Sequence, residues 1–462
     1  MSLIPALMSP TDAMFLIPES REQPMHVGSL QLYEPPPGSG PDYLTRLYQQ
    51  AIAERSVKAQ FRKRPYRGLS TLGQWAWTVD EDIDLEHHVR HSALPPPGRI
   101  RELLALASRL HGTLLDRQRP MWEVHLIEGL ADGRFAVYTK IHHSMMDGVA
   151  GLRLMARSLS PDPSRLGMPL PFVEDRDPES AGTGAGGSLA GVMRGAANAV
   201  SGAVGLAPRL LRIAESGVRD QVTALPLQAP RTALNVPITG SRRFAADGWD
   251  LARIKAVGRA ADATVNDVVL AMCSGALRSY LLELDALPES SLVAMTPVSL
   301  RGADAGDDSG NAVGTILCVL GTDLDEPAQR LEMVKASMSQ AKSNLAGLSQ
   351  MQVTALSGFM VAPLILSTAV ADASRIMRPP YNLVVSNVPG PPSTLYWNGS
   401  RLAGVYPLSI PTHGQALNIT VTSYAGQMEF GLIGCRRTLP HMQRLLTGLD
   451  AELKALEVAF GI

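Results

Sequence analysis

The sequence predicts a mixed α/β protein with two domains. At 462 residues the chain is longer than a single hydrophobic core usually supports. Both halves alternate segments of strand periodicity with segments of helical periodicity. Between them, residues 180–203 are mainly Gly, Ala and Ser, which is typical of a linker. We therefore expect an N-terminal domain over residues 1–160, a crossover linker over 161–235 and a C-terminal domain over 236–462.

The bulk composition narrows the class of protein. Hydrophobic residues make up 45% of the chain and the formal net charge is -1, as in soluble globular proteins. A protein that binds nucleic acid would carry a basic surface, so we expect no nucleic-acid partner. The 3 cysteines lack disulfide or metal-ligand spacing, which indicates free thiols in a reducing cytoplasm. We expect no signal peptide at the N-terminus, and the longest apolar run, residues 358–371, is too short to span a membrane.

In the N-terminal half the periodicity predicts three strands and three helices. The strands are expected at residues 27–33, 122–127 and 135–141, and the helices at 43–53, 100–115 and 151–159. The strand at 122 opens with a tryptophan, and the basic run at residues 62–67 is expected to be a loop.

In the C-terminal half the clearest helix is expected at residues 264–282. Thr264 is a plausible N-cap, and Asp267 three residues later completes the pattern of a capping box. Strands are expected at 291–298, 313–320, 383–386, 417–424 and 427–433. The other helices are expected at 206–222 and 440–458. The helix at 206–222 is basic and amphipathic, so it either packs on a domain or lies on a membrane surface.

The motif with the clearest chemistry is His-His-Ser-Met-Met-Asp-Gly at residues 142–148, where the strand at 135–141 ends in a loop. A neutral imidazole accepts protons near neutral pH, so a histidine here suits the activation of a hydroxyl nucleophile. Asp147 would hold the loop or orient the ring. Two alternatives remain open: structural hydrogen bonds made by the histidines, and a metal site. The metal site is disfavoured because the zincin helix spacing and a nearby cysteine are both absent.

Several motifs together resemble one known family. The His-His-x-x-x-Asp-Gly motif is similar to the signature of the CoA-dependent acyltransferase superfamily. Residues 119–124, 264–269, 386–391 and 434–438 resemble the bacterial wax ester synthase/diacylglycerol acyltransferase family in order and spacing, and residues 8–15 and 24–28 fit it too. The family often has Leu where this chain has Met121, a volume-conserving difference. The resemblance covers essentially the whole chain.

This resemblance implies an α/β (α+β) fold of two chloramphenicol-acetyltransferase-like domains with the active site at their interface. It also implies an O-acyltransferase that moves a long-chain acyl group from acyl-CoA, as co-substrate, to a fatty alcohol or diacylglycerol. No cofactor or metal is expected. His143 would be the general base, and Asp147 would hold the loop through an ion pair for which Arg301 is a candidate partner. Asn266 would donate to the oxyanion, because a helix N-terminus favours developing negative charge.

Other residues have supporting or alternative roles. His142, Gly148 and Asp267 are expected to support the site. Candidate substrate or CoA contacts are Trp122, Arg242 and Arg243. Trp122 is equally well interpreted as a core anchor, and paired arginines suit phosphate by geometry. The basic run at 62–67 is either a solvated loop or a patch for CoA phosphates or anionic lipid headgroups.

Two other function classes stay open. One is a condensation-type acyltransferase with another thioester donor, although the chain has no room for a carrier domain. The other is a non-catalytic lipid-inclusion protein, which predicts a decayed motif, whereas here the motif is intact. We expect a cytoplasmic protein from its free cysteines, and the water-insoluble substrates of the family imply that it is peripheral to membranes or lipid inclusions.

Overall fold

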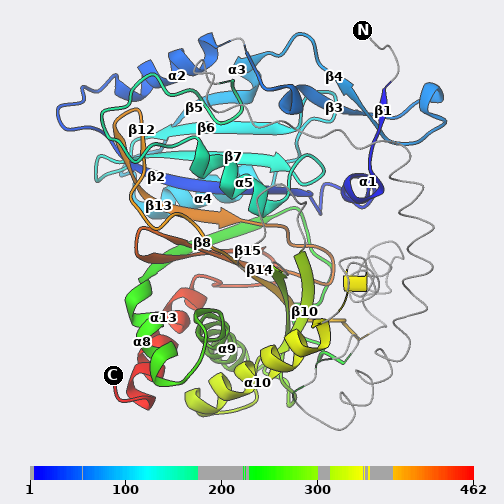
Figure 1. The fold of residues 1–462 in the computed structure, drawn as a ribbon, viewed down its shortest axis with the longest axis vertical. Coiled ribbons are helices and arrows are strands. Elements are labelled where there is room, and N and C mark those ends of the chain that lie inside the picture. Colours follow the sequence, from blue (N-terminus) through cyan, green and yellow to red (C-terminus); the bar gives the residue numbers. More distant parts are fainter. Residues whose placement is uncertain are drawn as a thin grey trace.

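The computed structural model describes residues 5–54, 56–174, 222, 224, 228–299, 313–346, 348, 352–353 and 378–462. Two six-stranded sheets lie one above the other in Figure 1, and a three-stranded sheet flanks the upper one. Arg301, the run at 358–371 and nearly all of the helix predicted at 206–222 lie outside the described residues. Within the described part, no helix is both long and apolar enough to cross a membrane.

The N-terminal sheet has the strand order β12-β13-β2-β7-β6-β5. Its strands from the first half of the chain are β2 (His26–Glu34), β5 (Val89–Ala93), β6 (Trp122–Glu128) and β7 (Phe135–His142). Its helices are α2 (Tyr43–Ala53), α3 (Leu85–His88), α4 (Ile100–His111) and α5 (Gly148–Arg157). Every residue of β7 is buried, including Lys140, whose Nζ pairs with Oε2 of Glu123 (3.1 Å).

Two neighbouring strands at one side of this sheet come from the other half of the chain. They are β12 (Tyr396–Trp397) and β13 (Ser400–Leu408), and β13 pairs antiparallel with β2. Hydrophobic periodicity identifies a strand but not its partner, so the sequence did not anticipate this exchange. The domain boundaries at residues 160 and 235 stay a prediction.

The C-terminal sheet has the order β10-β9-β11-β14-β15-β8. Its strands are β8 (Arg242–Asp250), β9 (Val293–Ser299), β10 (Val313–Val319), β11 (Leu383–Val388), β14 (Leu417–Tyr424) and β15 (Gln427–Cys435). Below it in Figure 1 lie α8 (Leu251–Ala260), α9 (Val265–Glu283), α10 (Pro327–Leu345) and α13 (Arg444–Ala459). The middle of α9 is buried on all sides between the sheet and its neighbouring helices, as its many apolar residues require. The mixed α/β fold with two sheet-rich halves, predicted from the sequence, is confirmed.

The third sheet has the order β1-β4-β3 and lies next to helix α1 (Pro10–Leu16). Its strands are β1 (Ala6–Leu7), β3 (Lys63–Tyr66) and β4 (Ala76–Val79). Most of the basic run at 62–67 therefore forms strand β3 and not the loop that was predicted. Its antiparallel pairing with β4 makes a hairpin.

The two large sheets meet through a shared apolar cluster. It contains Leu30 and Tyr138 from the N-terminal sheet, Phe244 and Ile433 from the C-terminal sheet, and Leu103 from α4. The cluster joins the two halves of the chain into one packed body.

Candidate active site

The histidine motif forms a tight turn between β7 and α5. The backbone N–H of His143 donates to the carbonyl of Met25 (2.9 Å), and that of Met145 donates to the carbonyl of His142 (2.9 Å). Asp147 is the N-cap of α5, where its Oδ1 accepts from the backbone N–H of Ala150 (2.7 Å). Asp147 thus holds the loop by starting the next helix. Gly148 is the first residue of α5, and a Cβ there would have no atom within 4 Å.

His143 lies in a largely desolvated position facing a pocket. Its ring stacks on Phe15 of α1, with centroids 4.0 Å apart and an interplanar angle of 22°. Burial lowers the pKa of His143 to about 4, and the charge of Asp147 only partly opposes this effect. At neutral pH the imidazole is therefore uncharged and able to accept a proton.

His142 has structural hydrogen bonds, in contrast to His143. Its Nδ1 accepts from the backbone N–H of Ser144 (3.1 Å) and lies 2.7 Å from the Ser144 hydroxyl. Because Nδ1 is an acceptor, the ring proton belongs on Nε2, which donates to Oε1 of Glu19 (3.1 Å). The structural interpretation of the histidines thus applies to His142, which supports the turn.

Glu19 is a residue of the site that the sequence did not reveal. Its carboxylate accepts from His142, pairs with Arg117 (2.8 Å) and accepts from the backbone N–H of Met25 (3.1 Å). Burial alone would raise the pKa of Glu19, but the hydrogen bonds and charge of these partners outweigh it, and the pKa lies below its usual range. Since Met25 in turn holds His143, this one carboxylate stabilises both histidines.

The pocket beside His143 has a volume of about 660 Å³. Residues from α1, β3, β4 and the histidine loop line it, including Asp12, Phe15, Lys63, Trp77, His143 and Met146. All of its lining residues lie in the N-terminal half. It offers room for a substrate next to the imidazole.

Two family motifs of the C-terminal half contact each other at the start of α9. Asn266 lies in the first turn of α9, and its Oδ1 is 3.4 Å from Nδ2 of Asn387 in β11. The predicted capping box is present: Oδ2 of Asp267 accepts from the backbone N–H (2.9 Å) and hydroxyl (2.7 Å) of Thr264. Asp267 therefore stabilises the helix start. Asn266 does not line the pocket beside His143, so its direct role in the chemistry stays a prediction.

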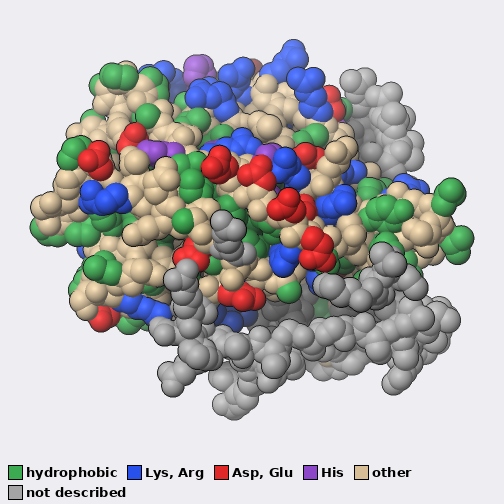
Figure 2. Space-filling model, turned by 90° about the horizontal axis from the view of Figure 1, so that it is seen from above, with side chains coloured by type: hydrophobic (Ala, Val, Ile, Leu, Met, Phe, Trp, Pro, Cys, Tyr) green, Lys and Arg blue, Asp and Glu red, His purple; other side chains and the backbone are tan. Residues whose placement is uncertain are grey.

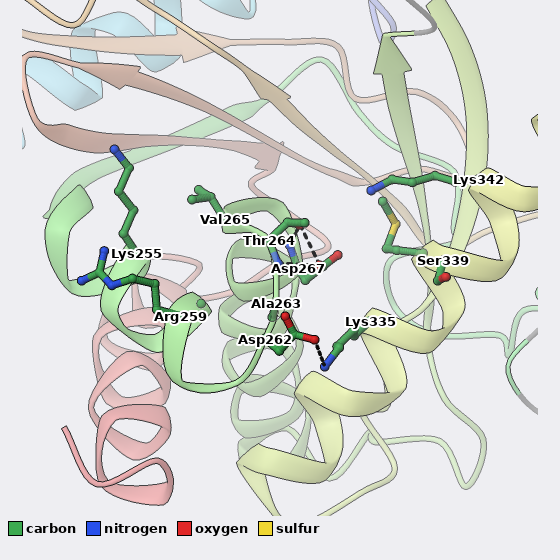
Figure 3. Close-up of a pocket in the computed structure, with 12 residues that line it drawn as sticks. Lys255, Arg259, Asp262, Ala263, Thr264, Val265, Asp267, Lys335, Ser339 and Lys342 are labelled. Carbon is green, nitrogen blue, oxygen red and sulfur yellow. Dashed lines mark hydrogen bonds and ion pairs between the residues drawn. The ribbon is translucent and has the colours of Figure 1, made fainter. Parts of the chain in front are cut away.

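A second pocket of about 720 Å³ lies between α8, α9 and α10 (Figure 3). Its basic lining residues are Lys255, Arg259, Lys335 and Lys342, and the N-terminus of α9 opens into it. Nζ of Lys335 donates a hydrogen bond to the backbone carbonyl of Ala261 (2.9 Å). Among the residues that the structure describes, none hydrogen-bonds to the side chains of Lys255, Arg259 or Lys342. The pocket therefore contains basic side chains that make no hydrogen bond within the described chain. The sequence did not predict this pocket, because α8 and α10 are far apart in the chain.

The candidate contact residues Trp122, Arg242 and Arg243 line neither pocket. Trp122 is fully buried, its ring stacks on His88 and Phe172, and its N–H donates to the carbonyl of Phe61 (2.9 Å). It has the contacts of a core anchor.

Arg242 is buried as well, which lowers its pKa to about 10. Its guanidinium donates to the backbone carbonyls of Thr239 and Glu22. The bond to Glu22 joins the two halves, and both bonds use donors that a phosphate would need. Arg243 follows on β8. In the described ranges, no group of three or more His, Cys, Asp or Glu side chains is arranged to hold a metal ion.

The chain has two α/β halves and a His-His-x-x-x-Asp-Gly turn at the end of a buried strand, and the turn places an uncharged histidine beside a pocket. These features together define an acyltransferase-type fold. The sequence comparisons name the family within this class. Residues 8–269 match the wax ester synthase/diacylglycerol acyltransferase catalytic domain, and residues 309–457 match the WS/DGAT C-terminal domain. The chain belongs to the wax ester synthase/diacylglycerol acyltransferase family.

Individual relatives agree with this assignment. The probable diacylglycerol O-acyltransferase tgs2 of Mycobacterium tuberculosis is 49% identical over 456 residues, which cover 99% of this chain and 100% of the relative. A solved wax ester synthase/diacylglycerol acyltransferase from Marinobacter aquaeolei VT8 is 44% identical, with a TM-score of 0.79 over 99% of this chain and 100% of that one. The first condensation domain of the calcium-dependent antibiotic synthetase is 18% identical with a TM-score of 0.57, and shares the fold.

Proposed function

We propose that this protein is an acyl-CoA-dependent O-acyltransferase that acylates diacylglycerol or a long-chain alcohol. The observation that carries the proposal is the uncharged imidazole of His143, fixed at the end of β7 and facing a pocket of about 660 Å³. The names of the relatives, diacylglycerol O-acyltransferases and a wax ester synthase/diacylglycerol acyltransferase, support the substrate class.

In the proposed reaction His143 takes the proton from the acceptor hydroxyl as its oxygen attacks the thioester carbonyl of acyl-CoA. The tetrahedral oxyanion then collapses, the C–S bond breaks, and the imidazolium returns its proton to the CoA thiolate. A buried imidazole is a weak base in the resting enzyme, so its developing positive charge needs support. The nearby carboxylate of Asp147 supplies it. Asn266 is the candidate donor to the oxyanion.

The basic pocket between α8, α9 and α10 is the proposed site for the CoA phosphates. Lys255 and Arg259 line it on one side and Lys342 on the other (Figure 3), and the N-terminus of α9 adds partial positive charge. This is the larger of the two pockets but His143 does not line it. It is therefore proposed to bind the distant phosphate end of the donor and not the reacting thioester.

The acceptors in question are insoluble in water, so the enzyme is proposed to work at the surface of a membrane or lipid inclusion. A peripheral contact would suffice, because interfacial binding requires apolar side chains and basic charge at one surface and no spanning helix.

The test is CoA release from palmitoyl-CoA, followed with a thiol reagent, with dioleoylglycerol, with hexadecanol and with no acceptor. Wild-type protein should release CoA only when an acceptor is present. His143→Ala should lose about 1000-fold in turnover, the middle of the range for a general base. His87→Ala, a change in a partly exposed histidine that lines neither pocket, should leave turnover unchanged. Wild-type turnover by folded His143→Ala protein would refute the assignment of the base, and release without acceptor would indicate a thioesterase.

A further inference from the structure

The end of the β3–β4 hairpin carries two leucines that are almost entirely in water. Leu69 and Leu72 are 97% and 91% exposed, and they lie on one short 3-10 turn, η2 (Leu69–Thr71), and its C-cap. Single exposed leucines are common on protein surfaces, but two on one turn are not explained in this way. The hairpin end extends away from the sheets on the right of Figure 1, and hydrophobic side chains lie at the same end in Figure 2.

The turn holds these leucines outward by its own hydrogen bonds. The backbone N–H groups of Leu72 and Gly73 donate to the carbonyls of Leu69 and Gly68, both at 3.0 Å. Thr71 is buried inside the turn, where its Oγ1 accepts from the Gly68 N–H (3.2 Å). The leucines are therefore presented by a formed structure.

Leu72 also has an unfavourable backbone conformation. Its φ is +50°, in the left-handed region, where glycine or asparagine is favoured over a bulky residue. Exposure of the side chain adds a second cost, because its apolar surface stays hydrated. The hydrogen bonds of the turn hold this backbone, but contacts within the described chain leave the apolar surface of Leu72 uncovered, which points to a partner outside the chain.

The charges around the turn indicate the chemistry of that partner. Residues 63–79 contain three basic residues, Lys63, Arg64 and Arg67, and no acidic residue. Arg67 is held at the hairpin end, where its Nε donates to the carbonyl of Gly73 (2.6 Å) and its guanidinium stacks on Trp75 (5.7 Å). Exposed leucines next to basic side chains are complementary to a negatively charged lipid surface. The leucines can enter the acyl region while the arginines remain at the headgroups.

We propose that the β3–β4 hairpin docks on a negatively charged lipid surface, with Leu69 and Leu72 inserted among the acyl chains. The same hairpin lines the pocket beside His143 through Lys63 and Trp77. Docking therefore places that pocket next to lipid-dissolved acceptor. The inference rests on the proposed function in this respect, because a lipid acceptor is what gives the docking its purpose.

The test is cosedimentation of the full chain with phosphatidylcholine vesicles, with and without phosphatidylglycerol. Wild-type protein should bind the anionic vesicles, and Leu69→Asn/Leu72→Asn should bind them at least about tenfold more weakly. Asparagine tolerates the left-handed conformation at position 72, so this variant should fold. Arg64→Gln/Arg67→Gln should remove the preference for anionic vesicles. Leu166→Asn is the matched control, because Leu166 is 71% exposed near Gly399, next to β12, and should leave binding unchanged.

Activity separates this inference from the proposed function. The Leu69→Asn/Leu72→Asn variant should release CoA normally with a short-chain, water-soluble alcohol and lose most release with diacylglycerol in vesicles. Equal binding of variant and wild type, or no binding of wild type, would overturn the docking proposal and favour a protein partner. Vesicle binding by a wild-type protein that never releases CoA would overturn the proposed function and leave the docking intact.

Discussion

The burial of one residue, His143, sets the expected pH dependence of the reaction. A lowered pKa means that the proton is lost at lower pH, so the neutral base is present above about pH 4 to 5. We expect kcat/KM for CoA release to be flat from about pH 6 to 8 and to fall only as the pH approaches about 4. The measurement is kcat/KM across this range, with circular dichroism to confirm folding at each pH. A titration midpoint at the ordinary histidine value of about 6.5 would contradict the buried environment.

Single residues also show how far a sequence can predict a site. His142, His143 and Asp147 lie within one short motif, so the sequence alone predicts that they are close together. Glu19 bonds to His142 across 123 positions, and no local pattern marks it as different from other acidic residues. Contacts of this kind are formed by the tertiary fold, which is why the sequence did not predict the role of Glu19.

At the scale of elements, the capping signal of α9 was predicted well, whereas β8, α8, α10 and the pairing of strands were not. The Thr264–Asp267 capping box is a pattern of side-chain reach within one turn, and it is present as expected. The basic run at 62–67 was taken for a loop because charge suggests solvent, yet most of it forms β3 against β4. No strand was expected at β12 or β13, and only the packed fold decides that β13 pairs with β2 and that β12 pairs with β13.

The arrangement of α8, α9 and α10 leads to a prediction about the acyl-CoA donor. Lys255→Ala/Arg259→Ala/Lys342→Ala should raise the KM for palmitoyl-CoA about tenfold, because about 1.4 kcal/mol of phosphate binding corresponds to that factor. The value of kcat should stay within about twofold, since these residues lie away from the imidazole. Steady-state CoA release at low salt measures both constants.

A surface control shows whether the loss of charge alone matters. Lys454→Ala removes an exposed lysine of α13 that pairs with Asp450 and lines neither pocket. Its KM should equal that of the wild type. A triple variant with an unchanged KM would exclude this pocket as the phosphate site.

At the scale of the whole molecule, the two halves depend on each other through β13. This strand belongs to the N-terminal sheet by pairing and packs against β14 and β15 of the other sheet. Tyr424 of β14 donates its hydroxyl to the carbonyl of Leu402 in β13 (2.9 Å). His413 donates its backbone N–H to the side-chain carbonyl of Gln23 (2.7 Å). The N-terminal sheet, whose strand β7 ends at the histidine turn, is therefore joined to the C-terminal sheet through β13.

A close approach between these sheets at Gly431 gives a stability prediction. A Cβ added at Gly431 of β15 would lie 1.8 Å from the backbone carbonyl oxygen of Pro407 in β13, so Gly431→Ala must push the two strands apart. We expect a loss of about 1–3 kcal/mol in the free energy of unfolding, the usual cost of overpacking. Calorimetry should show this as a melting temperature lower by about 1–3 °C, since the entropy of unfolding scales with chain length. Gly40→Ala, where a Cβ would meet no atom within 4 Å, is the control and should change stability by no more than about 0.5 kcal/mol. If both variants melt with the wild type, β13 and β15 can separate freely, and the two halves are not coupled through this contact.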